Sequence, residues 1–96
     1  MKPSQALESN RLAIRRIVES HRASNARVFG SVLRGEDTEQ SDLDILIEPT
    51  AKTSLMDVAA IQLELEELLG MHVDVSTPKA LPEKFRFKVI AEARPV

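Results

Sequence analysis

Two aspartates, Asp42 and Asp44, stand two residues apart at the start of an apolar run, and the Gly-Ser step Gly30–Ser31 precedes them. Carboxylates are preferred ligands of Mg²⁺, which is usually held by one or two of them together with substrate phosphates. Gly30 has no Cβ, so its backbone can approach a phosphate closely. Ser31 offers a hydroxyl and a backbone N–H at the start of a predicted helical turn, where anions are favoured. These residue types predict a site for a nucleoside triphosphate and a divalent metal.

Two further residues extend this prediction. Asp74 lies between two valines of a later predicted strand, and two metal ions about 3.5–4 Å apart can activate an attacking hydroxyl and stabilise a leaving oxygen. Asp42 and Asp44 suit the bridging positions of such a pair, with Asp74 completing one ion. Arg34 suits a bidentate phosphate contact, and equally an exposed helix charge. For the aspartates, the alternative is that they cap a turn, deter strand pairing or face solvent.

The elements that must position these residues follow from apolar periodicity and turn signals. Ser54 and Asp57 resemble a capping box that opens a helix, and Gly70 suits the position after its last turn. The predicted elements are a helix over 3–21, a strand over 27–29, one helical turn over 31–34 closed by Gly35, a polar loop over 36–41, a strand over 43–47, a helix over 55–69, a strand over 72–76 and a helix over 83–93.

The connections between strands predict how they pair. A short connection between the first two strands favours antiparallel neighbours, and a full helix before the third favours a parallel crossover. The predicted fold class is α+β, with a small mixed β-sheet of about three strands and helices packed against it. Antiparallel pairing brings Gly30 and Asp42 to the same edge. Because strand side chains alternate, Asp42 and Asp44 share one face, which Asp74 can also reach.

Length and composition set the broad class. The 96 residues suffice for one small domain, 1–96, with a modest core. A hydrophobic share of 43% is ordinary for a soluble globular domain, and the chain has no cysteine for a disulfide or a thiolate metal site. No apolar run approaches the ~18 residues of a membrane span, and no signal peptide is visible. We therefore expect a cytoplasmic protein without a membrane partner.

Charge is distributed unevenly along the chain. The net charge is −2, but residues 1–35 carry +5, residues 36–76 carry −10 and residues 77–96 carry +3. An acidic centre between basic flanks suits a site that gathers cations and receives polyphosphate, although solvated helix faces would give the same pattern. An acidic chain with few aromatic residues and no dense basic stripe argues against nucleic acid as a partner.

Other common motifs are absent. His21 and His72 form no compact zinc-ligand cluster in the sequence and are expected at a helix end and a strand edge. A calcium loop beginning at Asp37 is excluded because Asp42 stands where glycine is required. A Walker loop is excluded because no Gly-Lys-Ser/Thr follows Gly30.

The predicted helix over 55–69 has ten apolar residues among fifteen, more than one buried stripe requires. We favour the interpretation that it is buried deeply against the sheet. The alternative is that its surplus apolar face, together with Phe85 and Phe87, binds a protein partner.

The segments Gly30–Gly35 (GSVLRG), Ser41–Ile45 (SDLDI) and Val73–Val75 (VDV) resemble the minimal nucleotidyltransferases of the DNA polymerase beta-like superfamily. The short form of this family often serves as the antitoxin to a HEPN-domain toxin. The resemblance covers most of the chain. One departure is Leu33, where many relatives have a small residue.

The resemblance implies a Mg²⁺-dependent enzyme that transfers a nucleotide, AMP from ATP, to a hydroxyl and releases pyrophosphate. It implies that Gly30 and Ser31 hold the distal phosphates and that Asp42 and Asp44 bind both metals. Asp74 would bind the catalytic metal and favour deprotonation of the acceptor. In antitoxin members the implied acceptor is a tyrosine of the toxin. Because this chain contains no tyrosine, such an acceptor must lie on a partner.

Two other functions stay open at this point. One is a non-catalytic antitoxin that masks its partner by binding alone. The other is a stand-alone enzyme that adenylylates a small hydroxyl compound, against which the short chain argues because it lacks a second domain to shape a substrate site.

Overall fold

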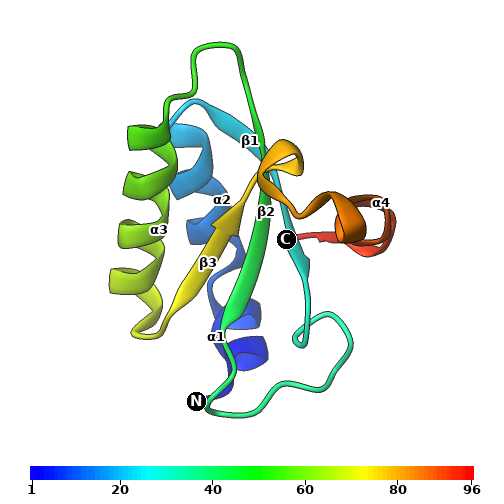
Figure 1. The fold of residues 1–96 in the computed structure, drawn as a ribbon. Coiled ribbons are helices and arrows are strands. Elements are labelled where there is room, and N and C mark those ends of the chain that lie inside the picture. Colours follow the sequence, from blue (N-terminus) through cyan, green and yellow to red (C-terminus); the bar gives the residue numbers. More distant parts are fainter.

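The computed structural model describes residues 1–96, and its centre is a four-stranded sheet (Figure 1). The strand order is β3-β2-β1-β4. Strand β2 pairs antiparallel with β1 and parallel with β3, as the connections predict, and β4 pairs antiparallel with β1. The strands are β1 (Ala23–Phe29), β2 (Leu43–Pro49), β3 (Val73–Ser76) and β4 (Arg94–Pro95).

Helices flank the sheet on both sides. Helices α2 and α3 cover one face, α1 adjoins α2, and α4 lies on the opposite side (Figure 1). The bounds are Pro3–Ser9 for α1, Arg11–Ser20 for α2, Leu55–Leu69 for α3, Glu83–Glu92 for α4, and Pro78–Ala80 for a short 3-10 turn, η1. None of these helices has both the length and the apolar composition that crossing a membrane requires.

The core lies between the sheet and the α2–α3 layer. Leu43, Ile45 and Ile47 are fully buried there, since alternate strand residues point to the same face. Ile14 and Val18 of α2 and Ile61 and Leu65 of α3 pack in the same cluster. This packing fixes the orientation of β2, so the intervening residue Asp44 projects from the other face.

The predicted helix over 3–21 is wrong in one respect, because it is broken at Asn10. The backbone of Asn10 leaves the helical region, with φ −133° and ψ 20°, and its side-chain amide donates a hydrogen bond to the carbonyl of Ala6 at 2.9 Å. Asparagine side chains compete in this way for the backbone groups that continue a helix. The chain therefore forms two short helices.

The sheet is larger than predicted. Ser24 and Asn25, which interrupt the apolar pattern, lie inside β1 at a bulge, where the register shifts before Arg27 and Asn25 takes a φ of +50°. The strand β4 was not predicted, because two residues, Arg94–Pro95, carry no periodic signal. It is held by its pairing with β1 and by a hydrogen bond from Arg15 Nη1 to the carbonyl of Val96 at 2.6 Å.

Helix α3 has the predicted bounds and caps. Ser54 Oγ accepts a hydrogen bond from the Asp57 N–H at 3.1 Å, and the Asp57 carboxylate accepts one from the Ser54 N–H at 2.9 Å. Gly70 ends the helix in the left-handed conformation, with φ +67°. These contacts are local, which explains why the sequence alone located both ends.

The favoured interpretation of deep burial for α3 is wrong. Leu55, Met56 and Leu63 are 89%, 78% and 61% exposed, because α3 contacts the sheet with one face and no second layer covers the other. Phe85 and Phe87 belong to α4, on the opposite side of the sheet (Figure 1), so they do not form one surface with α3. Binding of a protein partner by the exposed face of α3 stays a prediction.

The two faces of α3 can be compared by substitution. Leu65→Ala should lower the free energy of unfolding by about 2–5 kcal/mol, because it opens a cavity in the core. Leu63→Ala, two residues earlier on the exposed face, should change it by no more than about 0.5 kcal/mol. Denaturant unfolding of both variants measures the difference. A loss of several kcal/mol for Leu63→Ala would contradict the described position of α3.

Candidate active site

A row of three side chains, those of Asp74, Asp44 and Phe29, crosses the sheet on the face opposite the core. Asp74 of β3 pairs in register with Asp44 of β2, and Asp44 pairs with Phe29 of β1. Neighbouring strands lie about 4.8 Å apart, so the two carboxylates stand side by side. Asp42 precedes β2, and its oxygens lie within 4.8 Å of ligand atoms of His72 and Asp74. The structure thus gathers all three aspartates singled out in the sequence.

Asp44 is the most perturbed of these groups. The pKa of its carboxyl is raised to about 6, first by the half-buried position of the side chain and then by the neighbouring charges of Asp74 and Asp42. Arg34 and His72 oppose this shift with their positive charges but do not cancel it. Burial and the neighbouring carboxylates thus both disfavour ionisation of Asp44, and a divalent cation bound there would offset this effect.

Residue 30 must be a glycine because it lies close to the Asp44 carboxylate. A Cβ at residue 30 would lie 2.2 Å from Oδ2 of Asp44, and the backbone φ is +76°, a value that side chains with L configuration disfavour. The sequence suggested that Gly30 is needed so that a phosphate can approach. The structure gives a second reason, which is that Gly30 makes room for the carboxylate.

The Gly-Ser step opens a hydrogen-bonded turn over residues 30–35, where the sequence predicted one helical turn. The N–H of Arg34 donates to the carbonyl of Gly30 at 3.2 Å, and the N–H of Glu36 donates to the carbonyl of Ser31 at 2.9 Å. Gly35 closes the turn with φ +71°, the usual way to end a helix. The backbone N–H groups of residues 31–33 donate no hydrogen bond within the chain. Consecutive free N–H groups of this kind form a concave site for anions.

Arg34 is found in the exposed arrangement. Its side chain is 54% exposed, and Nε lies 2.7 Å from Oε1 of Glu36. Its charge still acts on Asp44, whose pKa it lowers. A contact between Arg34 and a phosphate stays a prediction.

His72 directly precedes the edge strand β3, as expected, and it also joins the carboxylate group, which the sequence did not indicate. Its Nε2 lies 3.0 Å from Oδ1 of Asp74, and its Nδ1 lies 2.8 Å from Oε2 of Glu66. The hydrogen bond with Asp74 is the main cause that raises the pKa of His72. The signal was available, since residues 72 and 74 are two apart and point to one face. His21 lies at the end of α2, as expected, and pairs with Glu64.

Asp37 is a second residue that the sequence did not single out. It is buried, and its Oδ2 accepts a hydrogen bond from the N–H of Ser4 in α1 at 2.9 Å, which lowers the pKa of the carboxyl. This contact ties the polar loop over 36–41, which leads into Asp42, to the N-terminal helix.

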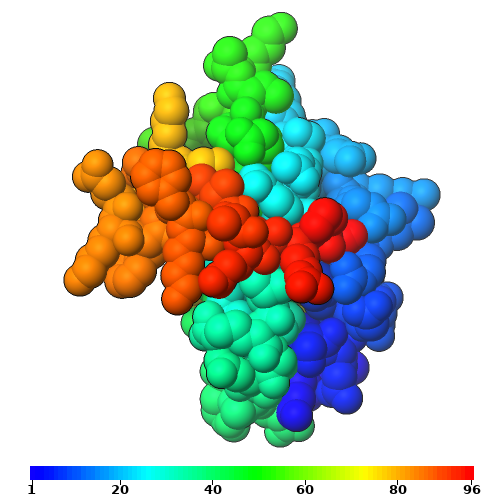
Figure 2. Space-filling model, turned by 90° about the vertical axis from the view of Figure 1, so that its right-hand side faces the viewer, coloured from blue at the N-terminus to red at the C-terminus, as the bar shows by residue number.

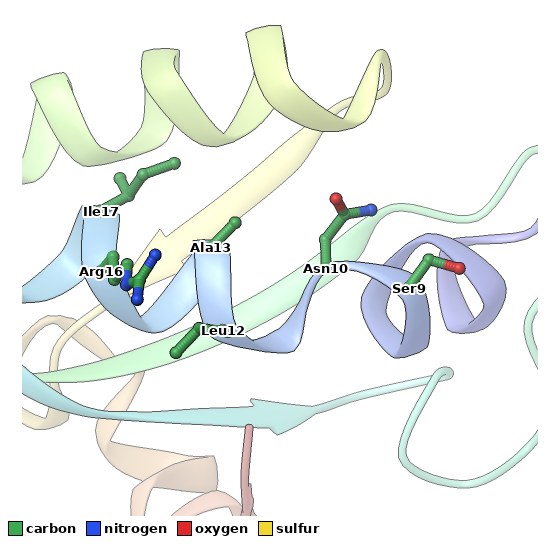
Figure 3. Close-up of a pocket in the computed structure, with 6 residues that line it drawn as sticks. All are labelled: Ser9, Asn10, Leu12, Ala13, Arg16 and Ile17. Atoms are coloured by element: carbon green, nitrogen blue, oxygen red, sulfur yellow. The ribbon is translucent and has the colours of Figure 1, made fainter.

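One hollow lies away from these residues. It measures about 490 Å³ and is lined by residues of α1 and α2 around the break at Asn10, including Leu12, Ala13 and Arg16 (Figure 3). Its lining includes no carboxylate and no residue of the Gly-Ser turn. The chemistry predicted from the sequence therefore lies on the other side of the sheet, towards α4.

Comparison with known proteins shows which family the chain resembles. A family model described as "Nucleotidyltransferase domain" matches residues 12–96. A proposed protein adenylyltransferase of Methanocaldococcus jannaschii, MJ0435, is 39% identical over 77 residues, which are 80% of this chain and 83% of that protein. The protein adenylyltransferase MntA of Thermococcus cleftensis is 38% identical over 65 residues, which are 68% of this chain and 66% of MntA.

Solved structures support the fold. The structure of a proposed minimal nucleotidyltransferase matches with a TM-score of 0.86 and 40% identity, covering 97% of this chain and 95% of that one. A toxin–antitoxin structure with AMP-PNP matches with a TM-score of 0.71 and 14% identity, covering 97% of this chain and 71% of that one. The first match confirms the predicted α+β class, and the second, at this identity, shows the fold alone.

The contact between Gly30 and Asp44 can be tested with a matched pair of variants. Gly30→Ala and Gly35→Ala should each lose about 1–2 kcal/mol of stability, because both backbones have positive φ. Only Gly30→Ala places a Cβ against a carboxylate, since nothing lies within 4 Å at Gly35. We therefore expect only Gly30→Ala to lose the rise in melting temperature on adding Mg²⁺ or Mn²⁺. Equal cation responses in the two variants would contradict this role.

The pKa of Asp44 predicts how stability depends on pH when divalent cations are removed with EDTA. The folded-state pKa, about 6, exceeds the ordinary value of 3.8, so the folded protein binds this proton more tightly. The ionised carboxyl then destabilises the fold above about pH 6, and protonation relieves this effect as the pH falls towards 4. Asp44→Asn should raise the melting temperature at about pH 8, and the gain should shrink at about pH 4.

Asp57 provides a control of opposite sign for this measurement. Its hydrogen bonds with Ser54 lower the pKa of its carboxyl, so its contribution is present at neutral pH and is lost on acidification. Asp57→Ala should therefore lower the melting temperature at about pH 8. If Asp44→Asn also lowered it there, the inferred crowding of carboxylates would be wrong.

Proposed function

The chain belongs to the nucleotidyltransferase domain family and is an enzyme of that class. From this premise we propose that it transfers AMP from ATP, with Mg²⁺, to a hydroxyl group of a partner protein. Support for the donor and for a protein acceptor comes from relatives named protein adenylyltransferase.

One observation carries the proposal. Three carboxylates and a turn with free N–H groups lie together on one sheet face, in contact through Gly30 and Asp44. The carboxylates are suited to a hard cation and the turn to an anion. A nucleoside triphosphate with its metal presents both charges at once. A site for folding alone would need neither feature, because crowded carboxylates destabilise the protein.

The donor set fits a Mg²⁺ site. Asp42, Asp44 and Asp74 supply oxygen ligands. The pKa of Asp44 is raised first by burial and then by the charges of Asp74 and Asp42, which a cation would offset. We propose that Asp42 and Asp44 hold two ions and that Asp74 completes one of them. When bound, Mg²⁺ would neutralise charge on the phosphates and favour ionisation of the attacking hydroxyl.

The remaining steps are assigned to the chain's own groups. The N–H groups of residues 31–33 and the hydroxyl of Ser31 bind the distal phosphate oxygens, and Arg34 can leave Glu36 to join them. Asp74, next to Asp44 on the side away from the turn, orients the acceptor hydroxyl and favours loss of its proton. The acceptor oxygen then bonds to the α-phosphorus as the bond to the pyrophosphate oxygen breaks.

The proposed acceptor of the nucleotide is a hydroxyl group on a partner protein. We propose a tyrosine of a HEPN-type toxin, which rests on the resemblance of the sequence motifs to minimal nucleotidyltransferases. The 96 residues contain no tyrosine, so a tyrosine acceptor must lie outside them. The cytoplasmic location and the interpretation of residues 1–96 as one catalytic domain also stay predictions.

The proposal predicts labelling of a partner. The chain, Mg²⁺, ATP labelled on its α-phosphate and a HEPN-type toxin should give a labelled toxin. Asp42→Asn and Asp44→Asn should each slow labelling at least about 100-fold, because each removes a charge that is needed at the reacting phosphate. Glu19→Gln is the matched control, since it removes one exposed negative charge on α2, outside the site, and should label normally.

The same experiment distinguishes catalysis from masking. If the double variant of Asp42 and Asp44 still neutralises the toxin as well as the unsubstituted chain, the partner is inhibited by binding alone. Labelling of a small hydroxyl compound but of no protein would instead favour the stand-alone enzyme.

A further inference from the structure

The outer edge of the sheet at β3 adjoins the carboxylates. The strand β3 is last in the order β3-β2-β1-β4 and pairs with β2 alone. The carbonyl of His72 accepts a hydrogen bond from the N–H of Leu43 at 3.2 Å, and backbone groups alternate in direction along a strand. The N–H groups of Val73 and Val75 therefore point away from β2, towards the open edge.

Two side chains of α3 bind these N–H groups. Oε2 of Glu66 accepts a hydrogen bond from the Val73 N–H at 3.2 Å, and Oε1 of Gln62 accepts one from the Val75 N–H at 3.5 Å. Both distances exceed the roughly 2.9–3.0 Å usual for such bonds, so the carbonyl of an incoming strand can replace either oxygen. Glu66 would keep a second partner, because Nδ1 of His72 lies 2.8 Å from its Oε2.

The edge is continuous with the row of site residues. Asp74 lies between the two valines and pairs in register with Asp44. A strand added at β3 would lie about 4.8 Å away and place one residue opposite Asp74, with its side chain on the same face of the sheet. That side chain would extend the row by one position. It would lie beside the Asp74 carboxylate, which is 49% exposed.

The opposite end of the row is less accessible to a protein segment. Helix α4 crosses the side of the molecule that bears the carboxylates, where its orange and red residues lie above the teal residues near 30–40 (Figure 2). Phe29, at that end of the row, shares a cavity with Phe85 and Val89 of α4. The β3 edge is therefore the more open approach to Asp74.

We propose that the outer edge of β3 binds an extended segment of the acceptor protein as an added strand, with the hydroxyl-bearing residue opposite Asp74. Main-chain carbonyls of that segment replace the two α3 side chains at the N–H groups of Val73 and Val75. Recognition then depends on an extended backbone more than on a particular side chain. The inference rests on the proposed function, because it assumes that the acceptor is a hydroxyl of a protein.

Amide hydrogen exchange, followed by NMR on the ¹⁵N-labelled chain, tests the edge directly. With the HEPN-type toxin of the labelling experiment added, the N–H groups of Val73 and Val75 should exchange at least about tenfold more slowly, because they enter a strand ladder. The N–H of Ser4 is the control. It is also bound by a carboxylate side chain, that of Asp37, and its exchange should stay the same.

Gln62→Ala and Gln5→Ala form a matched pair for transfer kinetics. Each glutamine accepts a hydrogen bond from a backbone N–H, that of Val75 or that of Lys2. Gln62→Ala removes a competitor of the added strand, so the KM for the toxin should fall about 2- to 12-fold, with kcat and calorimetric binding of ATP with Mg²⁺ unchanged. Gln5→Ala should change none of these values.

Val75→Pro removes the donor itself. Because the Val75 N–H points away from β2, proline at this edge position breaks no bond of the sheet, and Asp74 before it keeps an extended backbone. The KM for the toxin should rise at least about tenfold, since the added strand loses a hydrogen bond and meets the proline ring. Unchanged binding of ATP with Mg²⁺ would show that the variant is folded.

The outcomes separate this inference from the proposed function. If the toxin is labelled but the Val73 and Val75 amides keep their exchange rates, the edge assignment is overturned and the proposed function stands. A higher KM for Gln62→Ala would also overturn it, because the glutamine itself would then bind the acceptor. If no protein is labelled, the proposed function fails and this inference with it.

Discussion

Repulsion between carboxylates that the sheet holds in register is the constraint on which the site depends. Asp44 and Asp74 stand side by side because β2 and β3 pair in parallel, and Asp42 lies at the edge of the same face. The protein cannot relieve this repulsion by turning β2, since Leu43, Ile45 and Ile47 are buried on the opposite face. The hydrophobic effect on one side of the strand therefore maintains an unfavourable arrangement of charge on the other.

The carboxylates and the Gly-Ser turn are built as one unit. The Asp44 carboxylate occupies the space that a side chain at residue 30 would need, and the same glycine begins the turn with free N–H groups. The turn is anchored beneath by the buried side chain of Val32. The close approach of Gly30 to Asp44 therefore fixes where the turn lies relative to the carboxylates.

Two residues outside the sequence motif contact the carboxylates or the loop that leads to them. His72 is held between Asp74 and Glu66 and brings positive charge to the row when protonated. Asp37 fastens the loop before Asp42 to α1 through Ser4. The sequence indicated neither contact, since His72 was expected only at a strand edge and Asp37 was considered only as the start of a calcium loop.

The sequence by itself determined the structural features that depend on residues close together along the chain. The capping box at Ser54, the left-handed Gly70, the turn closed by Gly35 and the alternation around Asp44 are local signals, and they sufficed for the fold class and the candidate site. Tertiary structure decided what depends on distant segments, since β4 exists only by pairing with β1 and the exposure of Leu63 depends on what packs against α3. A cavity between the end of β1 and α4 likewise brings Phe29 and Phe85 together, and no periodicity in the sequence indicates a contact between residues so far apart.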